Sequence, residues 1–346
     1  MSPALASLLE QVQPAGVILF SRNIVSAEQT YKLLKDCQAQ VETPLFRCVD
    51  LEGGKVDRLR SAIGPAPSPA EVFASGEKKL YRAHGRLIGG NCRAVGFNID
   101  FAPALDLAFE ASKSVMSSRA VSVDPKETSI YAREFLRGLR ESRVLGCGKH
   151  FPGLGEGTLD SHHELPVIGK AWKKLWEQDL APFRTLRREL PIIMVSHAAY
   201  PAVTRERTPT SLSKKWITDI LKKKMGYRGM IASDDLEMGG VLSVAPIEQA
   251  AVGFVKAGGD LCLICHKEEF VTRSFAEIER AFAEDLAFAK RASESVKRVL
   301  AFKKRSPGLR RWAKAPAAKN VERLSRLLWE FGEQVRLETI RRQELA

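Results

Sequence analysis

Residues 144–150, VLGCGKH, form an apolar run that ends in a lysine and a histidine. A short apolar run bounded by polar residues is typical of a strand buried in a parallel sheet. Polar residues directly after such a strand lie at the carboxyl edge of the sheet, where α/β proteins place their ligands. The stretch therefore predicts a buried strand with a functional position at its end.

Six further runs of this kind occur along the chain: GVILF (16–20), LFRCVD (45–50), NIDFAPALD (98–106), IIMVSH (192–197), GMIASDD (229–235) and DLCLIC (260–265). Helical patterns separate them, at 26–40, 78–94, 124–142, 170–189, 213–225, 246–258 and from about 267 onward. This alternation predicts a parallel sheet covered by helices. No glycine fingerprint opens a helix after the first strand, so a dinucleotide-binding fold is unsupported.

Polar residues end most of the predicted strands: Asp50, Asp106, Lys149 with His150, Ser196 with His197, and Ser233 with Asp234. An open sheet concentrates its site at one switch point, whereas a closed barrel collects residues from its whole rim. We therefore predict a TIM-type (β/α)8 barrel. Only seven strands are predicted, because the helical pattern ALASLLEQVQ begins almost at Met1. Either the barrel lacks its first strand or the natural chain begins upstream of Met1.

The formal net charge of +13 is concentrated near the C-terminus, where residues 301–346 hold 12 Lys and Arg against 5 Asp and Glu. We predict a barrel domain over 1–305 and a basic helical tail over 306–346. The tail is interpreted as a solvated helix, with an anion-binding patch as the alternative. It lacks interleaved aromatic residues, so no nucleic-acid partner is predicted.

No apolar run approaches the roughly 18–20 residues of a membrane helix, and the start of the chain does not resemble a secretory signal. We therefore expect a cytoplasmic monomer without a membrane partner. Cys262 and Cys265 are three apart on a predicted strand and point to opposite faces, which disfavours a shared metal. P-loop, HExxH and GxSxG motifs are absent. No cofactor or metal is predicted, because the conceivable ligands lack metal-site spacing: His150, Asp160, His162 and His197.

A glycine-rich segment joins the strand predicted over 144–150 to the triplet Asp160-Ser161-His162. In extended backbone, residues two apart project to the same side. The Asp160 carboxylate can then hold one ring nitrogen of His162 and leave the other to exchange protons, as a general acid/base requires. The alternative is a pair that only pins a loop, and His163 is interpreted as structural.

Asp234 ends the run GMIAS at the expected catalytic edge. A carboxylate placed there can act as a nucleophile in glycosyl transfer. Its neighbour Asp235 is the rival candidate. We interpret Asp235 as the cap of the turn that follows.

Polar residues that could bind a sugar follow the second predicted strand, in VDLEGGKVDRLR (49–60). Asp50 and Arg58 offer an acceptor and donors for a pair of hydroxyls, with a loop salt bridge as the alternative. Gly53 and Gly54 allow a sharp turn. Further donors are predicted from other segments: Arg119, Lys149 and His150.

KHFPGLGEGTLDSHHELP (149–166) resembles the K-H-F-P-G-H-G…D-S-H…L-P segment of the family 3 glycoside hydrolases. GVILFSRNI, VDLEGGKVDRL, NIDFAPALDL, SRAVSVDP, IIMVSHAAYP and KKKMGYRGMIASDDLEMGG are similar to further landmarks of that family, in the same order. The similarity is strongest to the bacterial β-N-acetylglucosaminidases (β-hexosaminidases) of peptidoglycan recycling and extends over most of the chain.

The resemblance implies a retaining hydrolase in which Asp234 is the nucleophile and His162, held by Asp160 on a mobile loop, is the acid/base. It also implies that Asp50, Arg58, Arg119, Lys149 and His150 bind the sugar. The expected substrates are muropeptide-type fragments that contain GlcNAc. One departure is Leu154, which replaces a histidine usual in the family. The alternatives are a β-glucosidase or GlcNAc phosphorylase of the same family, or an inactive sugar-binding barrel.

Overall fold

The structure of the chain is a computed structural model that describes residues 1–157 and 164–345. Seven strands form one sheet in the order β1-β2-β5-β6-β7-β8-β9. Their bounds are β1 Gly16–Leu19, β2 Phe46–Val49, β5 Ile99–Asp100, β6 Leu145–Phe151, β7 Ile192–Val195, β8 Met230–Asp235 and β9 Leu261–Leu263. Strands β3 (Leu51–Gly53) and β4 (Val56–Asp57) form a separate antiparallel hairpin.

Helices connect these strands. Their bounds are α1 Pro3–Val12, α2 Ala27–Ala39, α3 Pro69–Ala74, α4 Lys78–Ala94, α5 Lys113–Met116, α6 Pro125–Glu141, α7 Trp172–Glu177, α8 Leu180–Leu186, α9 Pro201–Thr204, α10 Gly239–Leu242, α11 Ile247–Ala257, α12 Glu268–Glu284, α13 Leu286–Arg305 and α14 Ala318–Glu344. The π-helix η5 spans Lys215–Lys224, and short 3-10 turns include η3 at Ser117–Arg119. None of the helices in the described residues combines the length and apolar character needed to cross a bilayer.

All seven predicted strands are present, and each pairing from β1 to β6 and from β7 to β9 is parallel. The predicted α/β fold with a parallel sheet is therefore confirmed. The described residues form seven sheet strands, so the eight strands of a full (β/α)8 barrel are not reached. The division at residue 305, with a separate tail, stays a prediction.

Three predicted elements differ in extent from the structure. The strand predicted over 98–106 is regular only at Ile99–Asp100, although single backbone bonds continue beyond it, such as the Phe101 N–H to the Val49 carbonyl at 2.8 Å. Pro103 within this stretch has no N–H to contribute. The helix predicted over 170–189 splits into α7 and α8, since Pro182 cannot donate to the carbonyl of Gln178. The helix predicted over 213–225 is the π-helix η5, whose end is marked by the Met225 N–H donating to the Ile220 carbonyl at 2.8 Å.

The chain divides into two compact units. Unit 1 comprises Met1–Ala104, Ser117–Cys147 and Pro307–Ala346, and unit 2 comprises Leu105–Met116 and Gly148–Ser306. Strand β6 contributes residues to both. Each unit has its own apolar core, and each is described by itself.

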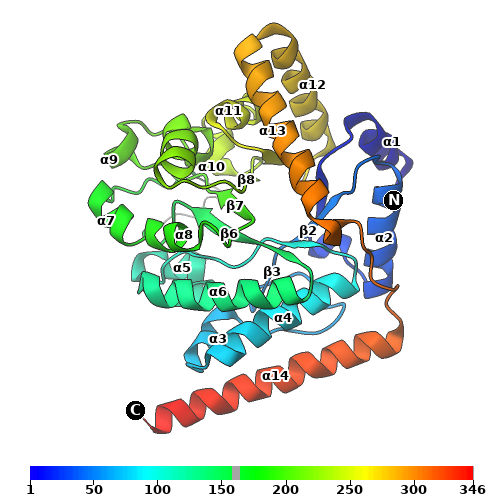
Figure 1. The fold of residues 1–346 in the computed structure, drawn as a ribbon, viewed down its shortest axis with the longest axis vertical. Helices are drawn as coiled ribbons and strands as arrows, with labels where there is room; N and C mark the ends of the chain where they lie inside the picture. Colours follow the sequence, from blue (N-terminus) through cyan, green and yellow to red (C-terminus); the bar gives the residue numbers. More distant parts are fainter. Residues whose placement is uncertain (158–163, 346) are drawn as a thin grey trace. The chain divides into compact units, whose positions relative to one another are not determined.

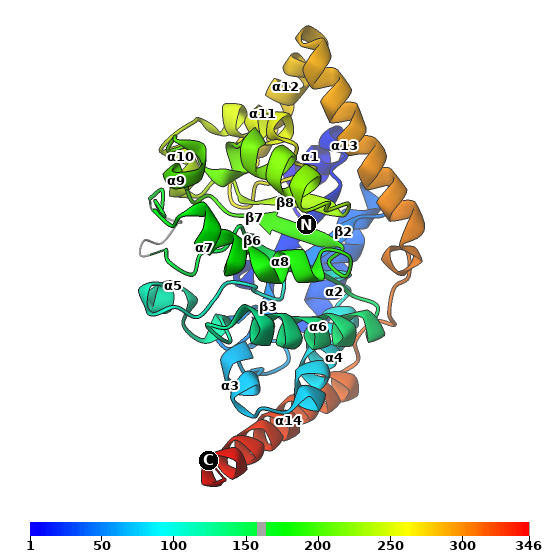
Figure 2. The same ribbon diagram turned by 60° about the vertical axis from the view of Figure 1, so that its left-hand side comes forward.

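Helices α4 and α6 pack closely in unit 1. Helix α6 begins with ordinary helix signals, since Asp124 accepts a bond from the Lys126 N–H at 2.7 Å and Pro125 occupies the first turn. The contact itself needs glycines, because a Cβ on Gly85 or Gly138 would collide with the backbone of the other helix. Figures 1 and 2 show the two helices side by side.

The C-terminal helix α14 completes the core of unit 1. Four of its residues recur at helical spacing and are buried in the main apolar cluster: Leu324, Leu328, Phe331 and Val335. The Phe331 ring stacks on the buried His84 ring, with centroids 5.9 Å apart. One face of the basic tail is therefore packed rather than solvated.

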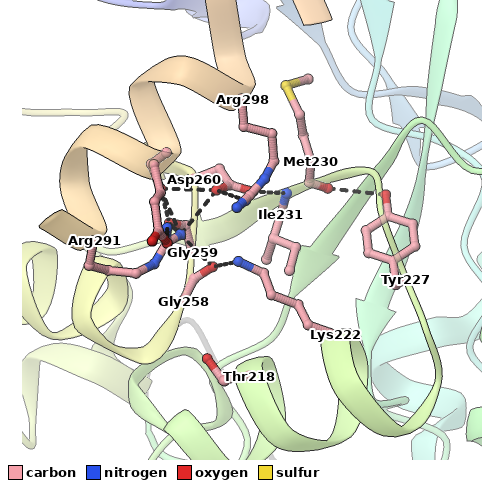
Figure 3. A network of polar contacts seen from close by, with 12 residues as sticks. Thr218, Lys222, Tyr227, Met230, Ile231, Gly258, Gly259, Asp260, Arg291 and Arg298 are labelled. Atoms are coloured by element: carbon pink, nitrogen blue, oxygen red, sulfur yellow. Dashed lines mark hydrogen bonds and ion pairs between the residues drawn. The ribbon is translucent and has the colours of Figure 1, made fainter. Parts of the chain in front are cut away.

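A buried carboxylate ties together the strand and helix ends of unit 2 (Figure 3). Asp260 is fully buried, and its Oδ2 accepts the Ile231 N–H of β8 at 3.1 Å. Its Oδ1 accepts the Ser295 hydroxyl at 2.9 Å and forms ion pairs with Arg291 at 3.2 Å and Arg298 at 3.3 Å. Helix α13 is thereby joined to the start of β9.

We predict that Asp260→Asn lowers the free energy of unfolding by about 3 kcal/mol, because two largely buried guanidinium groups lose their anionic partner. Urea unfolding followed by circular dichroism measures the change. The matched control is Asp219→Asn, which removes an exposed pair with Lys223 and should change stability by less than about 0.5 kcal/mol. Equal effects of the two substitutions would contradict the assigned role of Asp260.

Candidate active site

Asp234 lies near the end of β8 in unit 2. Adjacent residues of a strand point to opposite sides, so the carboxylates of Asp234 and Asp235 diverge. The Asp235 N–H donates to Oδ1 of Asp234 at 2.9 Å and fixes that oxygen. The other oxygen of Asp234 can then face a reacting atom.

The surroundings of Asp234 keep it ionised. Burial alone would raise the pKa of this carboxyl. The electrostatic influence of the His150 and His197 rings, the Asp235 N–H and the Lys149 ammonium together outweigh burial, so the pKa of Asp234 is lowered below its ordinary value. A carboxylate that stays ionised while largely removed from water is suited to nucleophilic attack.

Asp106 holds the end of β6 in place. Its Oδ2 accepts a bond from the His150 ring at Nδ1, at 2.7 Å, and another from the His150 backbone N–H at 3.1 Å. Its Oδ1 accepts the Leu154 N–H at 2.6 Å. The Nδ1 proton is thereby directed at the carboxylate, and the tautomer and orientation of the ring are fixed.

His197 is a second buried imidazole, and it lies near the Asp234 carboxylate. Its Nε2 donates to the Asp235 carbonyl at 2.9 Å, so its Nδ1 accepts from the Ser211 hydroxyl at 2.8 Å. Burial lowers the pKa of His197, although the nearby Asp234 carboxylate opposes the shift. The neutral ring thus supports the backbone that carries Asp234 and Asp235.

Asp235 is turned toward the loop after β9. Burial raises the pKa of Asp235 to about 6, and the neighbouring charge of Glu237 adds to the rise. Its Oδ1 accepts the Glu237 N–H at 3.1 Å, and its Oδ2 lies 3.2 Å from Nε2 of His266. The predicted capping role of Asp235 at this turn is confirmed.

Unit 1 contains the other predicted sugar-binding residues. Arg119, in η3, donates from Nε and Nη2 to the two oxygens of the buried Glu52, at 2.9 and 2.7 Å. Asp50 directly follows β2 and is half-buried. Arg119 therefore has a bidentate carboxylate partner that fixes its direction.

Arg58 lies one residue after β4 and is half-buried. Its guanidinium carbon is 5.7 Å from the centroid of the Phe20 ring. Its Nε is buried and has no hydrogen-bond partner among the described residues. The positive φ angles of Gly53 and Gly54, 91° and 61°, confirm the sharp turn predicted between Asp50 and Arg58.

The structure brings some of the predicted site residues together. Asp234, Lys149 and His150 belong to unit 2, whereas Asp50, Arg58 and Arg119 belong to unit 1. The predicted dyad of Asp160 and His162 lies outside the described residues and stays a prediction.

Several residues of the site were not assigned a catalytic or sugar-binding role from the sequence. Asp106 and His197 end predicted strands, and that position was their only signal. Glu52 sits within the glycine-rich segment but has no pattern that pairs it with Arg119. Ser211 belongs to a turn distant in sequence from His197, and no local signal identifies it.

Comparisons with known proteins match most of the chain. The family "Glycosyl hydrolase family 3 N terminal domain" matches residues 1–302. A protein named beta-hexosaminidase from Idiomarina loihiensis is 36% identical over 255 residues, which cover 72% of this chain and 76% of that protein. One of the same name from Bordetella avium is 35% identical over 262 residues, which cover 73% of this chain and 74% of that protein.

Among solved structures, a family 3 β-N-acetylglucosaminidase from Paenibacillus sp. str. FPU-7 superimposes with a TM-score of 0.89 at 30% identity. The match covers 96% of this chain and 65% of that chain, so the present chain spans less than two thirds of the length of that structure. The seven-stranded sheet, the carboxylate at the end of β8 and the match over residues 1–302 lead to one conclusion. The chain belongs to the glycosyl hydrolase family 3 N-terminal domain family and is a glycoside hydrolase, as its resemblance to that family predicted.

Proposed function

We propose that the chain is a retaining β-N-acetylglucosaminidase that releases terminal, non-reducing β-linked GlcNAc from muropeptide-type fragments. The observation that carries the proposal is the Asp234 carboxylate, held ionised at the end of β8 by His150 and Lys149. The name beta-hexosaminidase of the relatives supports the same activity. No resident cofactor or metal is part of the proposal, and the enzyme is proposed to act as a cytoplasmic monomer.

The first half of the proposed reaction forms a covalent intermediate. An oxygen of Asp234 attacks the anomeric carbon while the bond from that carbon to the leaving oxygen breaks. His162 gives its proton to the leaving oxygen, and Asp160 stabilises the charge change on the ring. These roles of Asp160 and His162 derive from the resemblance and from their spacing.

The second half restores the enzyme. Water attacks the anomeric carbon, its proton passes to His162, and the bond between that carbon and Asp234 breaks. Two displacements at one carbon retain its configuration. The sugar hydroxyls are proposed to bind Asp50, Arg58, Arg119, Lys149 and His150.

The electrostatics of unit 2 suit this sequence of steps. In the covalent intermediate Asp234 carries no charge, so the positive His150 and Lys149 favour its departure as a carboxylate in the second step. Asp106 holds His150 in one orientation throughout, which avoids reorganisation during reaction. Preorganised charge of this kind is a large part of enzymatic rate enhancement.

The chain should hydrolyse p-nitrophenyl β-GlcNAc at least about a hundredfold more efficiently than the β-glucoside, as release of p-nitrophenol measures. Asp234→Ala should lower kcat by at least about a thousandfold, because the covalent path is lost. Azide should restore turnover in this variant and give the α-glycosyl azide, since a single displacement inverts the anomeric carbon. The matched control is Asp235→Asn, for which we expect less than about a tenfold loss. Full activity of Asp234→Ala, or preference for the glucoside, would refute the proposal.

His162→Ala should slow substrates with poor leaving groups far more than activated ones, because only poor leaving groups need a proton during departure. A series of aryl β-GlcNAc glycosides of graded phenol pKa measures this difference. His163→Ala is the matched neighbour and should not change the dependence on leaving group. Equal slowing across the series in His162→Ala would remove His162 as the proton donor.

Asp106→Asn should raise the pKa of Asp234, because a neutral partner no longer stabilises the positive form of His150. Asp234 is needed in its ionised form, so the acidic limb of the kcat/KM profile should move to higher pH by about 0.5–1 unit. Asp36→Asn, which removes an exposed pair with Lys32, serves as the control. If the acidic limb of the kcat/KM profile does not move in Asp106→Asn, then His150 does not control the ionisation of Asp234.

A further inference from the structure

A cationic cavity lies beside the β3–β4 hairpin of unit 1. It has a volume of about 470 Å³. Three cations and three hydroxyl groups are among the residues that line it: Lys55, Arg58, Arg60, Ser21, Ser68 and Ser118. Hydroxyl, ammonium and guanidinium groups are the donors that proteins use to bind carboxylates and phosphates.

The two carboxylates that line the cavity are occupied by other donors. The oxygens of Asp57 accept the N–H groups of Leu59 at 3.1 Å and Ala66 at 2.9 Å. Glu71 forms a capping box, in which its Oε2 accepts both the N–H and the hydroxyl of Ser68 at 2.7 Å. Within residues 1–157 and 164–345, no carboxylate lies within 4 Å of the charged nitrogens of Lys55, Arg58 or Arg60.

A hydrogen bond and a glycine shape the wall of the cavity. Arg60 donates from Nη2 to the Gly54 carbonyl at 2.6 Å, which anchors the guanidinium at the turn. Gly54 has a φ of 61°, and a Cβ at this position would lie 2.5 Å from Cβ of Ser68. Only glycine leaves this wall of the cavity open. The buried Nε of Arg58 lacks a partner in the described part of the chain.

A second hollow continues from this cavity toward α14. It measures about 740 Å³, which is within the range of small-molecule sites, and shares Gly54, Arg60 and Glu71 with the first. Trp329 of α14 lines it and is 69% exposed, although Leu328 beside it is buried in the core. Figures 1 and 2 show α14 running beside α3 in unit 1.

An exposed indole and three cations with no ion-pair partner within 4 Å in the described residues suit one class of ligand, although Arg58 and Arg60 also act electrostatically on Asp57. The apolar C–H face of a sugar ring can pack on an indole, while its hydroxyls remain hydrogen-bonded. A carboxylate on the same saccharide would complement Arg60 and Lys55. We propose that the two hollows form a binding site for an acidic oligosaccharide, with a sugar ring on Trp329 and a carboxylate at Lys55, Arg58 and Arg60.

This site goes beyond the proposed hydrolysis and shares only Arg58 with the proposed substrate contacts. It does not involve Asp234, and a non-hydrolysed ligand can test it. The probe is a hyaluronan tetrasaccharide that begins with glucuronate at its non-reducing end. Its matched counterpart is the same tetrasaccharide with the carboxylates reduced to alcohols.

Titration calorimetry on the full chain should give at least about tenfold tighter binding of the acidic probe than of the reduced one. Raising NaCl from 50 to 300 mM should remove most of this preference. Lys55→Gln, and the double variant Lys55→Gln/Arg60→Gln, should bring the affinity for the acidic probe toward that for the reduced one. Trp329→Ala should lower the binding affinity for both probes by about tenfold.

The matched control for Trp329→Ala is Leu337→Ala, an exposed residue of the same helix that does not line either hollow. It should bind both probes as the original chain does. Equal affinity of the original chain for the two probes, or unchanged binding by Trp329→Ala or by Lys55→Gln/Arg60→Gln, would overturn the proposal. Hydrolysis of p-nitrophenyl β-GlcNAc should persist in the Lys55→Gln/Arg60→Gln variant. Failure of the binding proposal, measured with the tetrasaccharides, is therefore distinguishable from failure of the proposed hydrolase activity.

Discussion

The hydrogen bonds to one buried carboxylate set the geometry of the end of β6, which carries His150. Asp106 accepts two bonds from His150 and one from Leu154, so the chain leaving β6 has a single path and the imidazole has a single orientation. With fewer donors, the free-energy cost of removing this carboxylate from water would exceed the stabilisation from its hydrogen bonds. Because both of its oxygens accept hydrogen bonds, Asp106 can remain inside the fold and act on the charge of His150 near the end of β6.

Two adjacent aspartates illustrate how such surroundings divide similar groups between different tasks. Asp234 is ionised because positive groups outweigh its burial, whereas the burial of Asp235 prevails and raises its pKa to about 6. Their opposite directions on β8 place them in these different environments. The divergence of pKa values between neighbouring carboxyls is a recurrent way of separating a charged nucleophile from a structural group.

The sequence allowed prediction of the features that depend on local pattern. The seven strands and their parallel order follow from apolar runs separated by helical patterns, and Asp234, Lys149 and His150 follow from their positions at strand ends. The pairing of Glu52 with Arg119 and of His197 with Ser211 could not be predicted, because distant segments meet only in the folded chain. The break between α7 and α8 was missed because a helical pattern outweighed Pro182, although proline restricts the helix at that position. The packing of α14 was missed because its many charges obscured a narrow apolar stripe.

The packing of α14 has a consequence for how the protein is made. Unit 1 takes its core from both ends of the chain, since Leu328 and Phe331 pack with residues of α4 such as Ile88. The ribosome delivers residues in order, so residues 148–306 of unit 2 emerge before this helix does. At about 5–20 residues per second, their synthesis takes roughly 10–30 seconds. During that interval the apolar surface that awaits α14 is uncovered on the nascent chain, and exposed apolar surface of this kind is prone to aggregation.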